Sequence, residues 1–293
     1  MGKLLRSITD DGFVKAFVFD STDVVLKAQK IHKLSNVATA ALGRTLTAAV
    51  LMAGDLKNEK DRVSIQIKSD GEIGNIVSEC YKTGEVKGFV SNGDVNIPLR
   101  ADGKLDVAGA LGHSGSLSVV KDLGMSEPQT GTVELVSGEI AQDISYYYMQ
   151  SEQIPTVIGL GVLVSKDGVL LGAGGYMVQL LPDHTEEVID KIEKNATELP
   201  KSVSLFFAED KDPKILMDTV LKDMPYKILE ESEGSYKCDC SRYRVEKAVI
   251  SLGKKEIEKM IEEEKSVEVA CHYCRKNYTL EAEDLKILLN IAK

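Results

Sequence analysis

SNVATAALGRTLTAAVLMAGDLK, residues 35–57, is rich in Ala and Leu and is apolar nearly all the way round a helical projection. A helix that is hydrophobic on every side is normally buried in a protein core. The stretch contains Arg44 and falls short of the roughly 20 consecutive apolar residues that a membrane span needs. It therefore predicts the central helix of a core and not a membrane-spanning segment.

Shorter segments around this helix predict a mixed α/β core domain over residues 1–180. Short β-type runs are bounded by turn signals, and Lys166-Asp167-Gly168 is a hairpin signal. Strands with hairpins and interspersed helices indicate the α+β class, not a doubly wound parallel sheet. The predicted elements are strands over residues 13–19, 63–67 and 86–90, a hairpin of residues 157–164 and 169–181, and helices over residues 22–32 and 140–153.

Residues 181–232 form an acidic connector with 13 acidic and 7 basic side chains. Asp183 with Glu186 predicts the start of one short helix, and Asp212 followed by Pro213 predicts the start of another. Helices this short are marginal in water, so we expect this helical linker to pack its apolar face on other parts of the protein. The residues of that linker apolar face are Val188, Ile189, Ile192, Ile215, Leu216, Val220 and Leu221.

Four of the five cysteines lie in the last segment, residues 233–293, as Cys238-Asp239-Cys240 and Cys271-His272-Tyr273-Cys274. In a reducing cytosol, two such pairs predict a metal or redox site and not a static disulfide framework. Four thiolates complete one tetrahedral zinc site, so we predict one zinc per chain. A module this small has little core of its own, and its folding would depend on the metal.

Two further residues have simpler interpretations. His272 lies inside the second pair, but with four thiolates available we expect it to face solvent. Cys80 follows an apolar stretch, and a lone cysteine is often a small buried hydrophobe.

Composition and spacing disfavour several function classes. The chain has 36 Lys+Arg against 46 Asp+Glu, a net charge of -10, so we expect neither nucleic acid nor a membrane as partner. Asp10 and Asp11 lie where a signal peptide would be apolar, and we expect a cytoplasmic protein. The Gly-rich residues 159–161 and 172–175 are not followed by the helix of a dinucleotide site. We expect no enzyme.

Oxidation of the four cysteines would act on the fold of this module. Thiolates are the form that peroxide and hypochlorite attack. If sequence neighbours pair, Cys238 joins Cys240 and Cys271 joins Cys274, and such short loops constrain the unfolded chain very little. Loss of zinc would remove about 10–16 kcal/mol of apparent binding free energy, whereas a whole domain has a stability of about 5–15 kcal/mol. The module should unfold and uncover apolar faces of the connector, which would suit binding of unfolded polypeptides.

The cysteine pairs resemble the zinc-binding redox switch of the redox-regulated heat-shock holdases, the 33 kDa chaperonin family. The resemblance covers essentially the whole chain. Besides Cys238, Cys240, Cys271 and Cys274, it includes the segments Ala41–Thr45, Gly103–Val107, Val119–Gly124, Val136–Glu139, Ser151–Pro155 and Leu252–Glu256.

The resemblance implies an ATP-independent cytoplasmic chaperone that is inactive with zinc bound and active when oxidised to two disulfides. It also implies binding of unfolded client proteins and a homodimer in the active state. Two other classes remain open at this point. A zinc-ribbon nucleic-acid-binding protein would need a basic excess that the 12 acidic and 12 basic residues of the last segment do not provide. A thiol–disulfide oxidoreductase could use Cys271 and Cys274, but such motifs usually open a helix.

Overall fold

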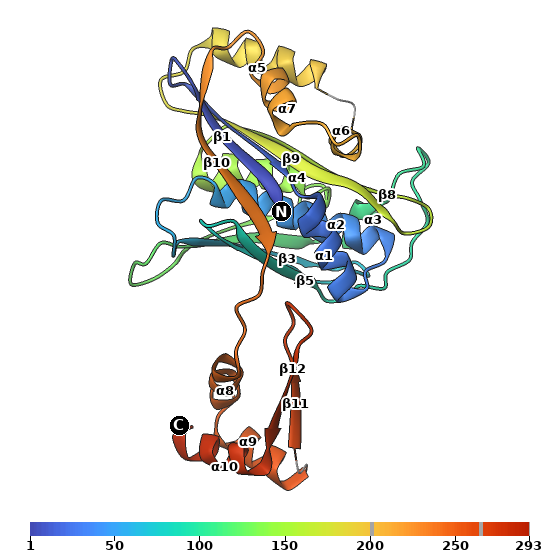
Figure 1. Ribbon diagram of the computed structural model, residues 1–293, viewed down its shortest axis with the longest axis vertical. Coiled ribbons are helices and arrows are strands. Elements are labelled where there is room, and N and C mark those ends of the chain that lie inside the picture. Colours follow the sequence, from blue (N-terminus) through green and yellow to red (C-terminus); the bar gives the residue numbers. More distant parts are fainter. Residues whose placement is uncertain (200–201, 264–265, 293) are drawn as a thin grey trace. The chain divides into compact units, whose positions relative to one another are not determined.

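The structure is a computed structural model that describes residues 1–199, 202–263 and 266–292. The chain forms two compact units, Met1–Lys237 and Cys238–Lys293 (Figure 1). The first unit combines one large sheet with helices and is mixed α/β, in agreement with the predicted class. The second unit is small and contains four of the five cysteines.

The first unit is built on a ten-stranded sheet in the order β7-β6-β3-β4-β5-β10-β1-β2-β9-β8. Neighbouring strands pair antiparallel, except that β10 and β5 pair in parallel through two residues of each strand. The predicted hairpin is confirmed as β8 and β9. The strands are β1 Gly2–Thr9, β2 Val14–Asp20, β3 Arg62–Ser69, β4 Ile76–Tyr81, β5 Glu85–Val90, β6 Gly115–Asp122, β7 Gln129–Glu134, β8 Thr156–Val164, β9 Leu170–Leu180 and β10 Tyr226–Tyr236.

The predicted central helix is confirmed as α2, Asn36–Ala53, in which every residue except Asn36 and Arg44 is buried. It contacts β3, β4 and β5 on one side and β2, β8 and β9 on the other, so the two halves of the sheet enclose it (Figure 1). By length and composition α2 could cross a membrane, but 89% of its 18 residues are buried inside the protein, as in the core helix of a folded domain. The Arg44 guanidinium forms an ion pair with the Glu139 carboxylate at an N–O distance of 2.7 Å.

The other helices of this unit lie on both faces of the sheet. The predicted helix over residues 22–32 is confirmed as α1, and that over residues 140–153 as α4 with its continuation η1, which ends before Pro155. The bounds are α1 Thr22–His32, α3 Val107–Leu111, α4 Ala141–Tyr147, η1 Tyr148–Glu152, α5 Glu186–Glu198, α6 Val203–Ala208 and α7 Pro213–Val220.

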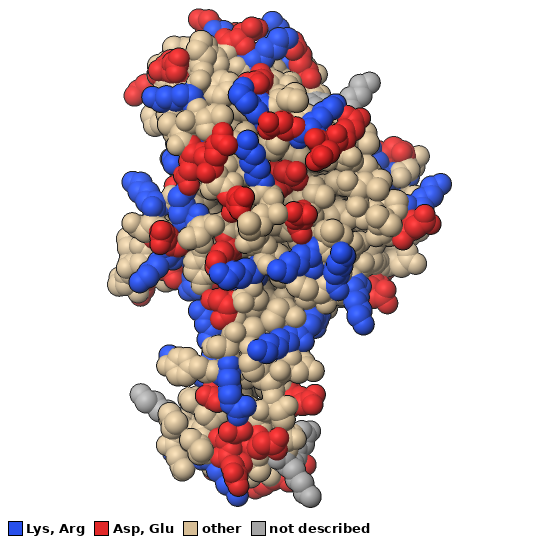
Figure 2. Space-filling view, viewed as in Figure 1, with Lys and Arg blue, Asp and Glu red and all other residues tan. Residues whose placement is uncertain are grey.

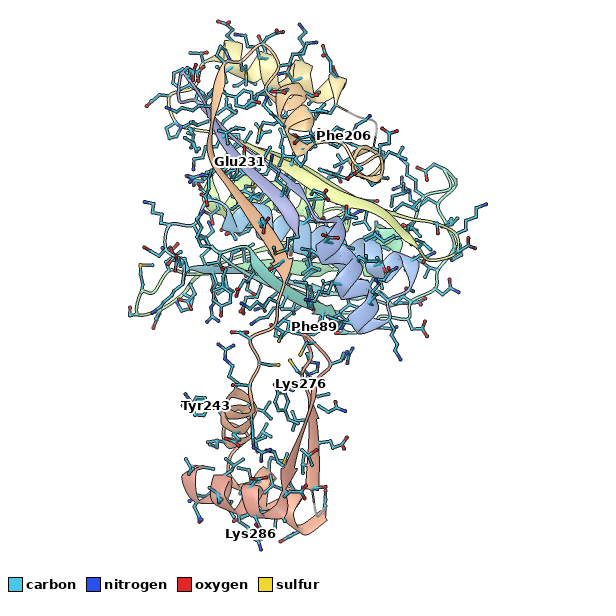
Figure 3. All side chains as sticks on the ribbon, viewed as in Figure 1. Phe89, Phe206, Glu231, Tyr243, Lys276 and Lys286 are labelled. Carbon is cyan, nitrogen blue, oxygen red and sulfur yellow. The ribbon has the colours of Figure 1, made fainter. Side chains whose placement is uncertain are left out.

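Helices α5, α6 and α7 cover the face of β1, β2 and β9 that is turned away from α2. Strand β2 is apolar on both faces: Phe17 and Phe19 belong to the core around α2, whereas Ala16 and Val18 pack with the helical layer. Phe206 on α6 belongs to the same layer (Figure 3). Of the predicted linker apolar face, the structure buries Val188, Ile192, Leu216, Val220 and Leu221, and it leaves Ile189 partly exposed.

Two details of the predicted connector are wrong. Ile215 is 51% exposed, because the buried face of α7 is formed by Leu216, Met217 and Val220 and Ile215 lies one helical step away from it. The cap of α5 is Thr185, and Asp183 instead takes a left-handed turn conformation with φ 66°. The second predicted start is confirmed, since the Asp212 side chain accepts the Lys214 N–H at 2.9 Å.

The sequence pattern did not predict β10. This strand crosses residue 232, where the predicted connector ends, and it pairs with β1 along its length. Contacts therefore divide the chain after Lys237 and not after residue 232. The division into a core domain of residues 1–180, a linker of residues 181–232 and a zinc-binding domain of residues 233–293 remains a prediction.

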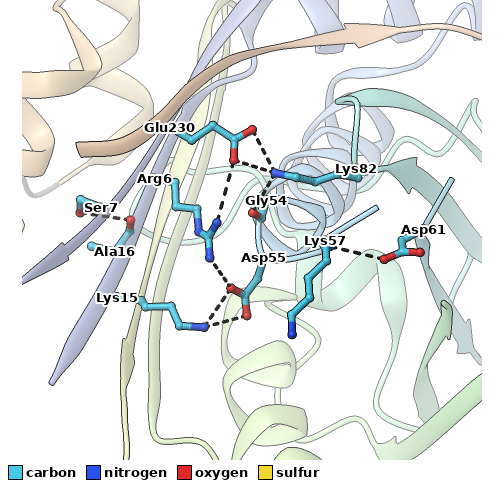
Figure 4. Close-up of polar contacts among 10 residues, drawn as sticks. All are labelled: Arg6, Ser7, Lys15, Ala16, Gly54, Asp55, Lys57, Asp61, Lys82 and Glu230. Atoms are coloured by element: carbon cyan, nitrogen blue, oxygen red, sulfur yellow. Dashed lines mark hydrogen bonds and ion pairs between the residues drawn. The ribbon is translucent and has the colours of Figure 1, made fainter. Parts of the chain in front are cut away.

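A charge cluster ties β10 to the end of α2 (Figure 4). Glu230 on β10 accepts hydrogen bonds from Lys82 Nζ at 2.8 and 3.0 Å and lies 3.9 Å from the Arg6 guanidinium. Arg6 and Lys15 both pair with Asp55, which follows α2, at 3.3 and 2.9 Å. The groups are partly exposed, so each pair contributes modestly, but together they fix the position of β10 against the core.

The second unit contains a two-stranded hairpin and three helices within its described residues. Its elements are α8 Arg242–Ile250, α9 Lys254–Glu263, β11 Ser266–Ala270, β12 Asn277–Glu281 and α10 Ala282–Ile291. Its core is small. The buried apolar residues are Val245, Val249, Ile257, Tyr278, Leu280, Leu285, Leu288 and Ala292.

The neighbouring residues Leu216 and Ile215 test how α7 is docked. We expect Leu216→Ala to lower the free energy of unfolding of the first unit by about 2–5 kcal/mol, because it leaves a cavity under α7. Ile215→Ala should change it by less than about 0.5 kcal/mol, because that side chain is mostly exposed. Urea unfolding followed by circular dichroism measures both. Equal losses in the two variants would contradict this docking of α7.

Candidate metal centre

Four sulfur atoms meet in the second unit. The Sγ atoms of Cys238, Cys240, Cys271 and Cys274 all lie within 4.8 Å of one another, so the structure brings together the four cysteines singled out from the sequence. Sγ of Cys238 is 3.7 Å from Sγ of Cys271, and Sγ of Cys240 is 3.4 Å from Sγ of Cys274. Sulfurs at about 2.3 Å from a tetrahedral ion would be about 3.8 Å apart. Disulfide sulfurs are bonded at about 2.05 Å. The geometry fits four thiolates around one ion.

The first pair lies in the segment between β10 and α8, which has no regular secondary structure. Its Cys-X-Cys spacing brings both sulfurs to the cluster. The intervening Asp239 pairs with the Arg244 guanidinium at 2.5 Å. The Ser241 hydroxyl accepts the Arg244 N–H at 3.3 Å and caps α8. Both contacts hold the segment against the start of α8.

The second pair lies in the turn between β11 and β12. The Cys271 N–H donates to the Lys276 carbonyl at 2.9 Å, and the Arg275 N–H donates back to the Cys271 carbonyl at 2.8 Å. Arg275 takes the left-handed conformation, φ 59°, that closes this turn. Cys271 and Cys274 thus lie in a β-hairpin turn. In a thiol–disulfide oxidoreductase, the two cysteines would be expected at the start of a helix, which is not their position here.

Tyr278 is a further residue at the site, which the sequence reasoning missed. Its phenol donates a hydrogen bond to Sγ of Cys240 at 3.1 Å, and its side chain is only 8% exposed. A buried tyrosine hydroxyl usually has a polar partner. Tyr278 and Leu280 alternate on one face of β12, so the period-two pattern could have indicated a buried phenol beside the cysteines.

The cysteines differ in how readily they ionise. Burial opposes ionisation of the Cys240 thiol, but hydrogen bonds from Tyr278 and the other cysteines outweigh it and lower the pKa of Cys240. Burial raises the pKa of Cys238 and of Cys274. The hydrogen bond to Cys240 raises the pKa of Tyr278 to about 12, so the phenol stays a donor at neutral pH. A bound cation would favour the thiolate form of every cysteine that it contacts.

The remaining two residues considered from the sequence lie outside the cluster. Cys80 is buried in the core of the first unit, as predicted, and burial raises the pKa of its thiol far above the usual range. His272 is exposed and is not among the residues whose ligand atoms converge. The four-sulfur cluster is thus formed by the other four cysteines, without Cys80 or His272 among its converging ligand atoms.

Comparison with known proteins places the whole chain in one family. The family model described as "Hsp33 protein" matches residues 2–281. The "33 kDa chaperonin" of Caldanaerobacter subterraneus subsp. tengcongensis is 47% identical over 290 residues, which cover 99% of this chain and 98% of that protein. The protein of the same name from Thermoanaerobacter sp. (strain X514) is 45% identical over the same shares of the two chains.

A solved structure agrees with these matches. The crystal structure of the 33 kDa chaperonin (Heat shock protein 33 homolog) from Thermotoga maritima superposes with a TM-score of 0.89 at 38% sequence identity. The superposition covers 99% of this chain and 98% of that one. A family model over nearly the full length and relatives of this identity lead to one conclusion: the chain belongs to the Hsp33 family.

Proposed function

We propose that the protein is a redox-regulated, ATP-independent chaperone that holds unfolding proteins when its four clustered cysteines are oxidised. The observation that carries the proposal is the convergence of four sulfurs, from two segments of one small unit, within 4.8 Å of one another. The names of the relatives support a chaperone. On the face shown in Figure 2, acidic and basic side chains are intermixed, and this face gives no support to a nucleic-acid-binding alternative.

In the reduced state, the four cysteines would hold one zinc ion. Bound zinc would keep the four sulfurs as thiolates and cross-link the segment before α8 to the hairpin turn. The core of the second unit has only eight buried apolar residues among those described. A unit with so little core needs such a cross-link, because its conformational entropy is not offset by burial alone.

Oxidation would remove the cross-link. One thiolate of a pair attacks a peroxide oxygen to give a sulfenic acid, and the second thiol displaces water from it to form the disulfide. Two thiols thereby lose two electrons and two protons, and one peroxide becomes two waters. Cys238–Cys240 and Cys271–Cys274 bridges would each close a very short loop, so neither would join the two segments. The second unit would then unfold.

The chain connection transmits this change to the first unit. Strand β10 ends at Tyr236, two residues before Cys238, and it pairs with β1. From β1, the Ser7 hydroxyl donates a hydrogen bond to Sδ of Met217 on α7 at 3.2 Å, so β1 contacts both β10 and the helical layer. We propose that loosening of β10 releases the α5–α7 layer and uncovers its apolar face and that of the sheet, where client proteins bind. The active form would be a cytoplasmic homodimer.

An apolar cavity already lies beside this layer. A space of about 540 Å³ separates α5 from α4 and η1, above the floor formed by β8 and β9. Its apolar lining includes Met149, Val157 and Ile189, of which Met149 and Val157 are exposed. Movement of α5 would widen this cavity into a continuous apolar surface, which supports the first unit as the client-binding part.

The zinc assignment predicts a stoichiometry. The reduced protein should bind one zinc per chain, and Cys271→Ser should weaken binding at least a hundredfold because one of four thiolates is lost. Cys80→Ala should keep wild-type affinity, since Cys80 belongs to the core of the other unit. Competition with a chromogenic chelator measures both. Full zinc affinity of Cys271→Ser would exclude the four-thiolate site.

The disulfide pairing can be mapped directly. After peroxide treatment, peptide mass spectrometry should find Cys238 joined to Cys240 and Cys271 joined to Cys274, with Cys80 reduced. The 3.4 Å separation of the Cys240 and Cys274 sulfurs makes a bridge between these two residues the competing outcome. Such a bridge would keep the two segments tied together and would contradict unfolding by loss of the cross-link.

Release of the α5–α7 layer should be sufficient for activity. Val220→Asp places a charge in the buried face of α7, so the reduced, zinc-loaded variant should partly suppress light scattering by a thermally unfolding reporter enzyme without ATP. Ile215→Asp is the matched control, because Ile215 lies on the same helix and is exposed. Oxidised wild type should be fully active and dimeric by sedimentation. If Val220→Asp releases α7, as shown by protease cleavage within it, and remains inactive, the coupling is wrong.

A further inference from the structure

We propose that Tyr278 is the positioning residue of the redox centre: its phenol holds the Cys240 sulfur in the metal-binding geometry and reduces the rate at which oxidants attack it. The inference rests on the proposed zinc switch. It adds a residue that controls how readily the switch responds.

The contact is a directed hydrogen bond from a fixed side chain. The Tyr278 hydroxyl lies 3.1 Å from Sγ of Cys240. The ring belongs to the small core of the second unit together with Val245, Val249 and Leu280, and β12 holds its backbone opposite Val269 of β11. Because packing and strand pairing both fix the ring, the hydroxyl cannot swing away from the sulfur without disturbing the core. The Cys240 side chain is thereby oriented from the hairpin that also contains Cys271 and Cys274.

A cation beside the ring strengthens this bond. Lys276 Nζ lies 5.0 Å from the centroid of the Tyr278 ring, within the range of a cation–π contact. A positive charge there draws electron density from the ring, which makes the phenol a stronger hydrogen-bond donor. The backbone carbonyl of the same Lys276 accepts the Cys271 N–H at 2.9 Å. One residue thus supports both the turn that holds the second cysteine pair and the donor to the first pair.

The chemistry of the sulfur gives this bond a function. A thiolate bound to a metal keeps lone pairs, and these attack an oxidant or an alkylating agent. A hydrogen bond occupies one lone pair and stabilises the negative charge, so it slows the attack. The same bond orients the ligand toward the metal, as outer partners of metal ligands commonly do. Tyr278 should therefore both strengthen zinc retention and lower the reactivity of Cys240.

The test compares Tyr278→Phe with Tyr243→Phe in the full-length, reduced protein. Phenylalanine keeps the buried ring and removes only the hydroxyl. Tyr243 lies on α8 of the same unit, is exposed, and so provides a matched control (Figure 3). The first readout is the zinc dissociation constant by chelator competition. The second is the rate of N-ethylmaleimide labelling of each cysteine, resolved by fragmentation of peptides 238–242 and 266–275.

Tyr278→Phe should weaken zinc binding about tenfold and speed labelling of Cys240 several-fold, more than that of Cys271 or Cys274. Tyr243→Phe should match the wild type. Lys276→Gln keeps the phenol but removes the cation beside its ring, so it should shift both readouts in the same direction by a smaller factor. If circular dichroism shows that Tyr278→Phe folds poorly, Lys276→Gln serves as the test of the positioning role. Unchanged values in Tyr278→Phe, or equal acceleration at all four cysteines, would overturn the positioning role while the zinc switch stands. A wild type without zinc would instead overturn the switch itself, and this inference with it.

Discussion

A helix with no polar side must be covered on every side, and this constraint organises the first unit. Helix α2 contacts strands from both halves of the ten-stranded sheet, and only Asn36 and Arg44 escape burial. The enclosing sheet is itself apolar on its second face over β1, β2 and β9, since Val18 and Leu5 point away from α2. That second face requires its own cover, which α5, α6 and α7 supply. The position of these short helices thus follows from the burial of α2.

The second unit would depend on a different kind of interaction, the metal cross-link proposed for its four cysteines. Among its described residues, this unit buries eight apolar side chains. Burial on this scale gives at most a small margin over the conformational entropy that a chain of this length loses on folding. Four converging sulfurs offer the missing cross-link, and it is one that oxidants attack. The first unit, in contrast, buries its fifth cysteine, Cys80, where burial disfavours the reactive thiolate. Under the proposed switch, the two units would respond differently to the same oxidant: the second unit would lose its main support, and the first would retain its core.

The elements that local pattern determines could be predicted, and those that depend on distant partners could not. The all-round apolar stretch predicted α2, and Lys166-Asp167-Gly168 predicted the β8–β9 hairpin. Strand β10 was missed because its Glu, Lys and Gly residues disfavour strands and because its partner β1 lies at the other end of the chain. The cysteine spacing identified four residues that converge, but not Tyr278, because its hydrogen bond joins β12 to Cys240 in a segment distant in sequence, and the alternation of β12 indicates burial but not that partner. Ile215 fits the apolar spacing and lies outside the buried face all the same.

Strand β10 is the place where the two kinds of stability meet. Its last residue, Tyr236, donates to the Gly88 carbonyl at 2.8 Å and lies 3.0 Å from Nε2 of His32, so the strand is anchored immediately before the first cysteine pair. A disturbance that travels along the chain from the second unit would reach this anchor first and then the partly exposed charge cluster at Glu230. Beyond them, the sheet is supported by α2, whereas α6 and α7, of six and eight residues, are too short to be stable without the sheet face on which they lie. Local opening follows the smallest buried surface, so once β10 loosens, the α5–α7 layer should open before the rest of the sheet does.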